Sequence, residues 1–400
     1  MSDVPQPYRN HWTVFLIFLR LGLTSFGGPI AHLGYFREEF VVRRQWLSER
    51  RYADLVTLCQ FLPGPASSQV GIALGLSRSG YGGALAAWMG FTLPSAIALV
   101  FFALGIASNG DAIPAGMLRG LKVVAVAVVA QAVWGMARNL CPDAPRKFIM
   151  LAATCFVLLM PSALGQLGVM ALGAAAGLLL LKPPPGDAHD PSPVCIRHRV
   201  GLFCLILFFA LLLGLPLLAT WFPSQMLSMV SVFYRAGSLV FGGGHLVLPL
   251  LQAEVVPSEW VDNDVFLAGY GAAQAVPGPL FTFAAFLGAS MNQAPSGWFG
   301  GLICLLAIFV PSFLLVVGAL PFWEHLRHSV RTQAALLGTN AAVVGLLLAT
   351  LYQPVWTTAI HAPQDFALAL VALVALFWKL PPWLVVLGSA VLGGLLSIAS

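Results

Sequence analysis

Two short stretches of this chain each occur twice. Residues 20–29 read RLGLTSFGGP, and residues 60–65 read QFLPGP. At offsets of 215 and 214 residues the chain reads RAGSLVFGGG at 235–244 and QAVPGP at 274–279. Glycine and proline patterns this uncommon, kept in the same order at nearly the same spacing, indicate an internal duplication.

The duplication extends through most of the chain. Gly80, Gly83, Pro94 and Ser95 recur 217 residues later as Gly297, Gly300, Pro311 and Ser312. We therefore expect three parts: a first repeat at 1–182, a Pro-rich linker with one extra transmembrane helix at 183–228, and a second repeat at 229–400.

The composition places this duplicated chain in a membrane. Of its 400 residues 59% are hydrophobic and only 9% are charged, against roughly 25% charged residues in a soluble domain. So little charge excludes both a soluble globular enzyme and a disordered protein. At roughly 20 apolar residues per crossing, the composition predicts an all-α polytopic membrane protein with about nine to thirteen membrane segments.

The charged residues indicate that the two repeats are inverted. The loop after the first Phe-Gly-Gly contains five arginines, whereas its counterpart after Phe241 contains acidic residues and no Lys or Arg. Because cytoplasmic loops are enriched in Lys and Arg, we expect the first loop inside and the second outside. Duplicated halves are typical of secondary transporters, whose substrate sites lie between the repeats near the bilayer midplane.

A plain crossing for every apolar run violates this charge bias. The bias is satisfied if 13–44 and 48–79 are broken helices that form re-entrant hairpins, as do their copies. The crossings of the first repeat and linker are then 82–107, 115–137, 148–162, 164–181 and 200–222. For the whole chain this gives about nine crossings and four hairpins, with up to 13 membrane segments as the alternative.

The two repeats contain four breaks in apolar helices, at 26–29, 63–65, 241–244 and 277–279. Backbone groups freed by Gly and Pro are tolerated at membrane depth only against protein or a water-filled cavity. Half-helices are expected to open at three prolines: Pro29, Pro65 and Pro279. Their N-termini would attract anions. A simple kink is the alternative, and the matched placement in both repeats disfavours it.

Arg20 and Arg235 lie six residues before the two Phe-Gly-Gly motifs, inside apolar segments. A charge near the bilayer centre costs roughly 2.5–3.5 kcal/mol on insertion scales, and a guanidinium offers a fork of donors for a tetrahedral oxyanion. The alternatives are snorkelling to the interface or pairing with Glu39 and Glu254, the acids matched between the repeats. Glu39, Glu254 and His32 are also the proton-coupling candidates.

The other candidates are neutral donors and backbone positions at the breaks, which can replace the hydration shell of an anion. The candidate substrate-binding residues are Arg20, Arg235, Thr24, Ser25, Gly27, Gly28, Pro29, Gln60, Pro63, Gly64, Pro65, Ser67, Ser68, Gly242, Gly243, His245, Gln274, Pro277, Gly278, Pro279 and Thr282. No catalytic residue, metal site or cofactor is expected, because the chain has no HExxH, GxSxG or nucleotide-binding P-loop motif. Transport would be powered by an ion gradient or a partner subunit.

The Phe-Gly-Gly-Pro break, the Arg-rich loop and QFLPGP at 60–65 together resemble the chromate ion transporter family in its long two-domain form. The second copies resemble that family's second domain, so the resemblance covers nearly the whole chain. It implies a multi-pass protein of the bacterial inner membrane that exports chromate from the cytoplasm with the proton motive force and confers chromate resistance. Gly244 stands where the first half has Pro29, so the halves are not expected to contribute equally.

The resemblance implies chromate and protons as partners within the lipid bilayer, with sulfate as a competitor. A transporter or channel for sulfate or another oxyanion stays open, as does a homodimer. The duplication and the missing catalytic motifs disfavour a membrane enzyme without a transport cycle. The basic residues are spread over short loops, so no nucleic-acid partner is expected.

Overall fold

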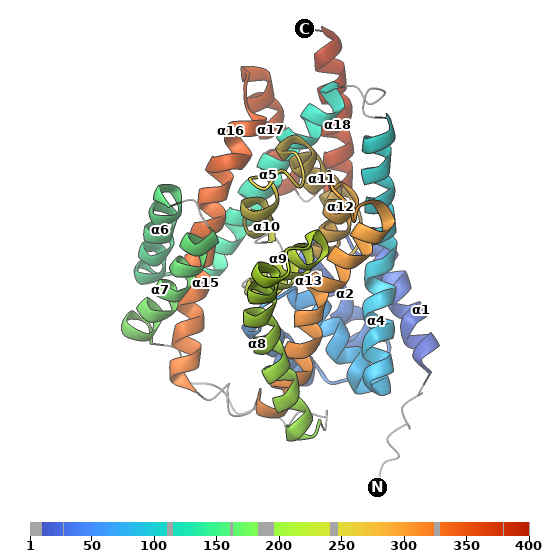
Figure 1. The fold of residues 1–400 in the computed structure, drawn as a ribbon, viewed down its shortest axis with the longest axis vertical. Coiled ribbons are helices and arrows are strands. Elements are labelled where there is room, and N and C mark those ends of the chain that lie inside the picture. The colour runs from blue at the N-terminus through green and yellow to red at the C-terminus, as the bar shows by residue number, and fades with distance from the viewer. Residues whose placement is uncertain are drawn as a thin grey trace.

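The chain folds entirely into helices over the residues that the structure describes (Figure 1). The computed structural model describes residues 10–26, 28–109, 115–160, 163–182, 196–240, 247–323, 329–378 and 380–399. The expected all-α architecture is confirmed, and every helix before residue 181 has a counterpart after residue 224.

The helices of the first repeat are α1 (His11–Thr24), α2 (Gly28–Arg37) with its π-helical extension η1 (Glu38–Arg43), α3 (Glu49–Phe61), α4 (Ala66–Asn109), α5 (Ala115–Leu140), α6 (Ala144–Leu159) and α7 (Ala163–Leu180). The extra helix α8 (His198–Trp221) follows the linker. The second repeat contains α9 (Gln225–Leu239), α10 (Val247–Val255), α11 (Asn263–Ala275), η4 (Leu280–Thr282), α12 (Phe283–Ala289), α13 (Gly297–Ala319), η5 (Leu320–Phe322), α15 (Val330–Thr350), η6 (Leu351–Trp356), α16 (Thr357–Ala359), α17 (Pro363–Phe377) and α18 (Pro382–Ala399).

Three of the four expected breaks separate helices as predicted. α2 begins at Gly28 with Pro29 in its first turn, and α4 begins directly after Pro65. In the second repeat the 3-10 turn η4 begins directly after Pro279. The fourth break, at 241–244, lies outside the described residues. A kink at Ser79 and Gly80 divides α4, and it coincides with the predicted boundary between the second hairpin and the first crossing.

The two repeats exchange helices. α5 of the first repeat packs against α17 and α18 of the second, and α15 of the second packs against α6 and α7 of the first. We call these groups the first arm (α5, α17, α18) and the second arm (α15, α6, α7). A Cβ on Gly120 would collide with the backbone of Ser389 in the first arm, and one on Gly338 with that of Gly173 in the second. Small residues let the helix backbones meet, as is common between membrane helices.

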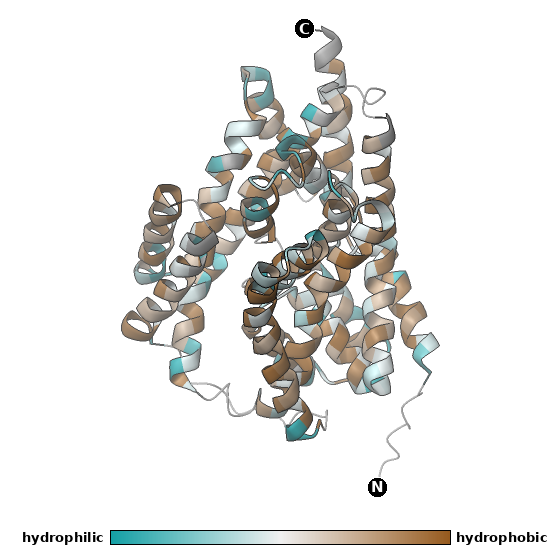
Figure 2. Ribbon diagram, in the orientation of Figure 1, coloured by the Kyte–Doolittle hydropathy of each residue, from teal (hydrophilic) through white to brown (hydrophobic). Residues whose placement is uncertain are grey.

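The outer surface is apolar. Within the described residues, five helices are long and apolar enough to cross a membrane: Ala66–Ala107, Arg119–Leu140, His198–Trp221, Gly297–Phe322 and Val330–Ala359. Figure 2 shows hydrophobic residues along these helices and hydrophilic ones gathered near helix ends and in connecting segments. The helices α6, α7, α17 and α18 have only 16, 18, 15 and 18 residues, fewer than the roughly 20 of a full crossing. The number of nine crossings therefore stays a prediction.

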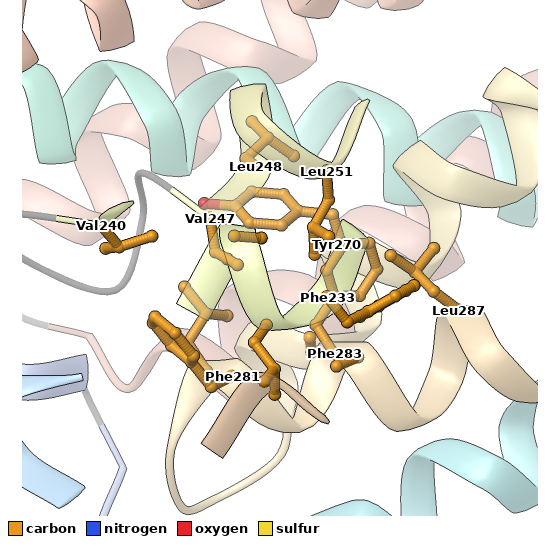
Figure 3. Close-up of a cluster of buried hydrophobic side chains, with 14 of the residues drawn as sticks. Phe233, Val240, Val247, Leu248, Leu251, Tyr270, Phe281, Phe283 and Leu287 are labelled. Carbon is orange, nitrogen blue, oxygen red and sulfur yellow. The ribbon is translucent and has the colours of Figure 1, made fainter. Parts of the chain in front are cut away.

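A buried aromatic and aliphatic cluster holds the second repeat together around its breaks (Figure 3). Phe233 comes from α9, Leu251 from α10, Tyr270 from α11 and Phe283 from α12, and all four are fully buried. Tyr270 and Phe283 meet edge to face with ring centroids 5.8 Å apart. This packing fixes the ends of α9 and α11, where the functional candidates lie.

Candidate functional site

The breaks of the two repeats meet through a reciprocal pair of backbone hydrogen bonds. The Gly278 N–H donates to the carbonyl oxygen of Ser25 over 3.0 Å, and the Gly64 N–H donates to that of Val240 over 2.6 Å. Ser25 is the C-cap of α1, and Val240 is the C-cap of α9. Each Pro-Gly-Pro turn therefore binds the end of the broken helix of the opposite repeat. We call these two contacts the inter-repeat bridges.

Both bridging positions require glycine. Gly64 has a φ of +121° and Gly278 one of +106°, backbone conformations that are strained for residues with a Cβ. A Cβ on Gly64 would also lie 3.0 Å from the Ser312 hydroxyl oxygen, and one on Gly278 would lie 2.9 Å from that of Ser95. Ser95 and Ser312 are themselves repeat partners, so these contacts also cross between the repeats.

Hydroxyl groups without a protein partner gather near the bridges. The side-chain oxygens of Ser25, Ser68, Thr92 and Ser312 are buried and have no hydrogen-bond partner among the described residues. A buried hydroxyl left without a partner costs about 1–3 kcal/mol. These four groups, from α1, α4 and α13, are therefore available to a polar ligand.

His32 lies directly beside one bridge. Its side chain is only 1% exposed. Nε2 lies 3.2 Å from the Ser25 carbonyl oxygen, the acceptor of the bridge from Gly278, and Nδ1 lies 3.4 Å from the Ser67 hydroxyl. The ring of Phe91 packs edge-on against the imidazole at 5.2 Å. The first break thus joins His32, Ser67, Ser25 and Gly278 in one cluster.

The half-helix N-termini differ between the repeats. At the start of α4, the N–H groups of Ala66, Ser67 and Ser68 precede the first intrahelical bond, which Gln69 donates to Pro65. In the second repeat Thr282 donates both its N–H and its hydroxyl to the Pro279 carbonyl. The N-terminus of α4 is therefore the freer of the two and offers donors and a positive dipole end.

The predicted arginines do not lie at the bridges in this conformation. Arg20 is exposed on the face of α1 that also exposes Trp12 and Leu16, opposite the face packed on α4. Arg235 is half-buried, and its Nη2 forms an ion pair with Glu254 on α10 at 2.5 Å. The expectation of pairing with the repeat-matched acids is therefore confirmed for Arg235.

The same expectation is wrong for Arg20. The buried carboxylate of Glu39 binds Arg43 and Arg44 instead, at 2.9 and 2.6 Å. These two arginines follow Glu39 in the π-helical extension and lie within reach of its carboxylate, whereas Arg20 points away from α2. Arg20 has no ion pair with any described residue.

The remaining predicted residues divide by position. Thr24 and Gln60 are exposed, Pro277 and Gln274 are half-buried, and the Pro63 carbonyl accepts a hydrogen bond from Gln69. Gly27, Gly242, Gly243 and His245 lie outside the described residues.

Sequence reasoning did not place Thr92, Ser95 and Ser312 in the site. The recurrence of Pro94-Ser95 as Pro311-Ser312 was the available signal, because a matched Pro-Ser step in two long helices marks the same depth in both repeats.

Two ion pairs join the first repeat to the second at one end of the molecule. Arg119 forms a two-pronged contact with Asp365, both distances being 2.7 Å. Lys122 binds Asp264 of α11 at 2.7 Å. At the position of Lys122 the second repeat has the neutral Asn340, so this contact between an arm and α11 has no charged counterpart.

Comparison with known proteins decides the family. The family model described as chromate transporter matches the chain twice, at residues 12–178 and 227–394. This chain belongs to the chromate transporter family. Members are transporters and not enzymes, and the chain is accordingly a multi-pass membrane protein built from two family domains.

Relatives span nearly the whole chain. A probable chromate transport protein of Synechococcus elongatus is 28% identical over 94% of this chain and 93% of its own length. A chromate transport protein of Pseudomonas aeruginosa is 28% identical over 91% of this chain and 85% of its own. An uncharacterized transporter of Bacillus subtilis, YwrA, is 31% identical and matches 41% of this chain with 92% of its own length, as a single repeat would. No solved structure matches the chain.

Proposed function

We propose that this protein is a secondary active transporter that exports chromate from the cytoplasm, driven by the proton motive force, and thereby confers chromate resistance. Two relatives that match most of the chain are chromate transport proteins by name. The observation that carries the proposal for this chain is the pair of inter-repeat bridges, which brings breaks from both repeats together. The alternative is a transporter or channel for sulfate or another oxyanion.

The proposed topology has two inverted repeats with re-entrant hairpins. Contacts between helix ends support it. His11 with Ser79, and His198 with Phe322, join ends that the charge bias assigns to the cytoplasm. In Figure 1 the repeat partners α5 and α15 run in opposite directions along the vertical axis. Each pair of short helices, α6 with α7 and α17 with α18, leaves the chain on the side where it entered, so this sidedness does not depend on whether they cross completely.

The proposed anion site lies at the inter-repeat bridges. The N-terminus of α4 supplies backbone N–H groups and its dipole, and the hydroxyls of Ser25, Ser67, Ser68 and Ser312 supply neutral donors. A tetrahedral dianion needs such donors to replace its hydration shell. The masked break at 241–244 and the α10 end belong to the same proposed site by repeat symmetry.

Arg20 and Arg235 are the proposed charged groups of the site. At 1.5 Å per helical residue, each lies about 7–8 Å along its helix from the bridge carbonyl of Ser25 or Val240. Arg20 is without an ion pair among the described residues, whereas Arg235 is held by Glu254. Arg20 is therefore the one free to follow an incoming anion, and Arg235 must share its guanidinium between the anion and Glu254.

The proposed transport cycle alternates access between the repeats. Lys122 and Asp264 link the first arm to α11 at the end assigned to the outside, so this conformation is held closed on the external side. The proton-coupling candidates are Glu39, Glu254 and His32. Both carboxylates are ion-paired to arginines, whereas His32 adjoins a bridge.

We place the protein in the inner membrane of a bacterium. A transporter of Methanocaldococcus jannaschii is 25% identical over 96% of this chain, so relatives are not restricted to bacteria. Homodimerisation is part of the proposal only as an arrangement that leaves the site within one chain.

Flux of labelled chromate into inverted membrane vesicles tests the proposed function. An imposed proton motive force is expected to accelerate uptake, and sulfate is expected to compete. Uptake of sulfate without chromate uptake would favour the alternative substrate, and flux that ignores the gradient would favour a channel. No flux of either anion would reject the proposed function.

A further inference from the structure

We propose that His32 takes up a proton together with the transported oxyanion, and that the Ser67 hydroxyl couples the two events. This inference rests on the proposed function, because it needs an anion at the N-terminus of α4. It adds how proton and anion binding become linked within that site.

The neighbours of the imidazole determine its neutral form. Nε2 faces the Ser25 carbonyl oxygen, which can only accept a hydrogen bond. The neutral ring must therefore carry its proton on Nε2, which leaves Nδ1 as an acceptor. The Ser67 hydroxyl, 3.4 Å away, then donates its only hydrogen to Nδ1.

Protonation reverses one of these hydrogen bonds. A proton arriving from water binds Nδ1, and the new N–H donates to the Ser67 oxygen. The Ser67 hydrogen is then released from the ring and can turn toward a ligand at the start of α4. Ser67 lies in the first turn of that helix beside Ser68, whose hydroxyl is buried without a protein partner.

Anion binding favours protonation for the same reason. A bound dianion draws the Ser67 hydrogen toward itself, which leaves the hydroxyl oxygen free to accept from Nδ1. It also adds a negative charge close to an imidazolium. Because linkage is reciprocal, each ligand raises the affinity for the other by the same factor.

No other titratable group is positioned to replace His32 in this cluster. The ring contacts Ser25 of α1, and Ser67 and Phe91 of α4, which are all uncharged. The titratable residues on packed elements lie elsewhere: Arg20 on the exposed face of α1, Tyr52 bonded to the Leu33 carbonyl, Cys59 in the apolar core of α3, Arg78 over Trp46, and Arg37 bound to Glu49 on the surface. On α2 itself Tyr35 is exposed, and Glu39 is bound by Arg43 and Arg44.

This coupling is compatible with export. A dianion that leaves with one proton carries one net negative charge outward. The inside-negative membrane potential favours that movement.

The test measures chromate binding by the purified full-length protein at about pH 8 and about pH 6. Wild type is compared with His32→Gln, which keeps hydrogen-bonding atoms but does not titrate, and with Ser67→Ala. His11→Gln is the matched control, because His11 also pairs with a serine, Ser79, at 2.8 Å but away from the breaks. The chromate's own protonation is the same for all four proteins, so differences between them report on the protein.

We expect the affinity of wild type and His11→Gln to rise on acidification about tenfold more than that of His32→Gln or Ser67→Ala. Wild type should also take up protons when chromate binds, beyond the uptake measured with His32→Gln. If His32→Gln does not fold, Ser67→Ala alone decides between these outcomes. A wild-type pH dependence retained by Ser67→Ala would overturn the inference and leave the proposed function standing. Absence of chromate binding by wild type at both pH values would reject both.

Discussion

Glycine at the inter-repeat bridges is a requirement of backbone geometry. Gly64 and Gly278 hold positive φ angles, approach serines of the opposite repeat, and donate the bridging hydrogen bonds. Strain of this kind costs about 1–3 kcal/mol per residue. A Cβ at either position must shift the turn and weaken the bridge.

We therefore predict that Gly64→Ala and Gly278→Ala each lower the thermal midpoint and reduce chromate flux about tenfold or more. Flux into vesicles and thermal unfolding in detergent provide the two measurements. Gly34→Ala is the control, since a Cβ there meets no atom within 4 Å, and it should behave as wild type. Normal flux in both bridge variants would show that the bridges are dispensable.

The two arginines of the repeat motif should respond differently to removal. Arg235→Ala leaves the half-buried Glu254 carboxylate without its counter-ion, so it should destabilise the protein by about 1–3 kcal/mol. The double variant Arg235→Ala/Glu254→Gln should recover that stability. Arg20→Ala removes an exposed charge and should reduce chromate resistance with no change in the thermal midpoint.

Chromate resistance in cells and thermal unfolding of the purified variants check this contrast. If Arg20→Ala and Arg235→Ala both reach the membrane and confer full resistance, neither arginine binds the anion.

At the scale of helices, the exchange between repeats determines which contacts can open and close. The first arm takes α5 from one repeat and α17 and α18 from the other. Lys122 on this arm binds Asp264 on α11, and the neutral Asn340 stands at its repeat position. One end of the molecule therefore has an ionic contact between arm and α11 that repeat symmetry does not duplicate.

We predict that Asp264→Lys lowers chromate flux severalfold, because it places two like charges together and changes how readily the external end opens. The swap Lys122→Asp/Asp264→Lys should restore most of the flux, since it recreates the attraction. Glu49→Lys, which breaks a surface pair within one repeat, is the control and should have little effect. A swap no better than the single variants would exclude a functional role for this pair.

The helices and breaks were largely predictable from sequence, for physical reasons. Gly and Pro free backbone groups that a membrane interior cannot satisfy, so FGGP and PGP marked helix ends correctly, and the Gly80 kink fell at the expected boundary. The exchange of α5 and α15 between repeats was not predictable, because it depends on distant contacts between small residues such as Gly120 and Gly338.

The candidate site was predicted only in part. Ser25, His32, Ser67, Gly64 and Gly278 do meet at the bridges. The ion partner of Glu39 was missed, because its neighbours Arg43 and Arg44 in the π-helical turn are closer than any residue of α1. A repeat pattern identifies equivalent positions, and it does not show which charged neighbour a side chain prefers.

For the molecule as a whole, the central claim is that both repeats build one anion site. The bridges are reciprocal, each break being bound by the turn of the other repeat. One site shared in this way differs from two sites, one in each repeat. The difference is measurable as a binding stoichiometry.

Equilibrium dialysis of labelled chromate against the purified protein, with the fold of each variant confirmed by thermal unfolding, tests this claim most directly. We predict one chromate bound per wild-type chain, and a loss of affinity of about tenfold or more in Gly64→Ala and in Gly278→Ala alike. Two chromates per chain, with each variant removing one of them, would contradict the shared site.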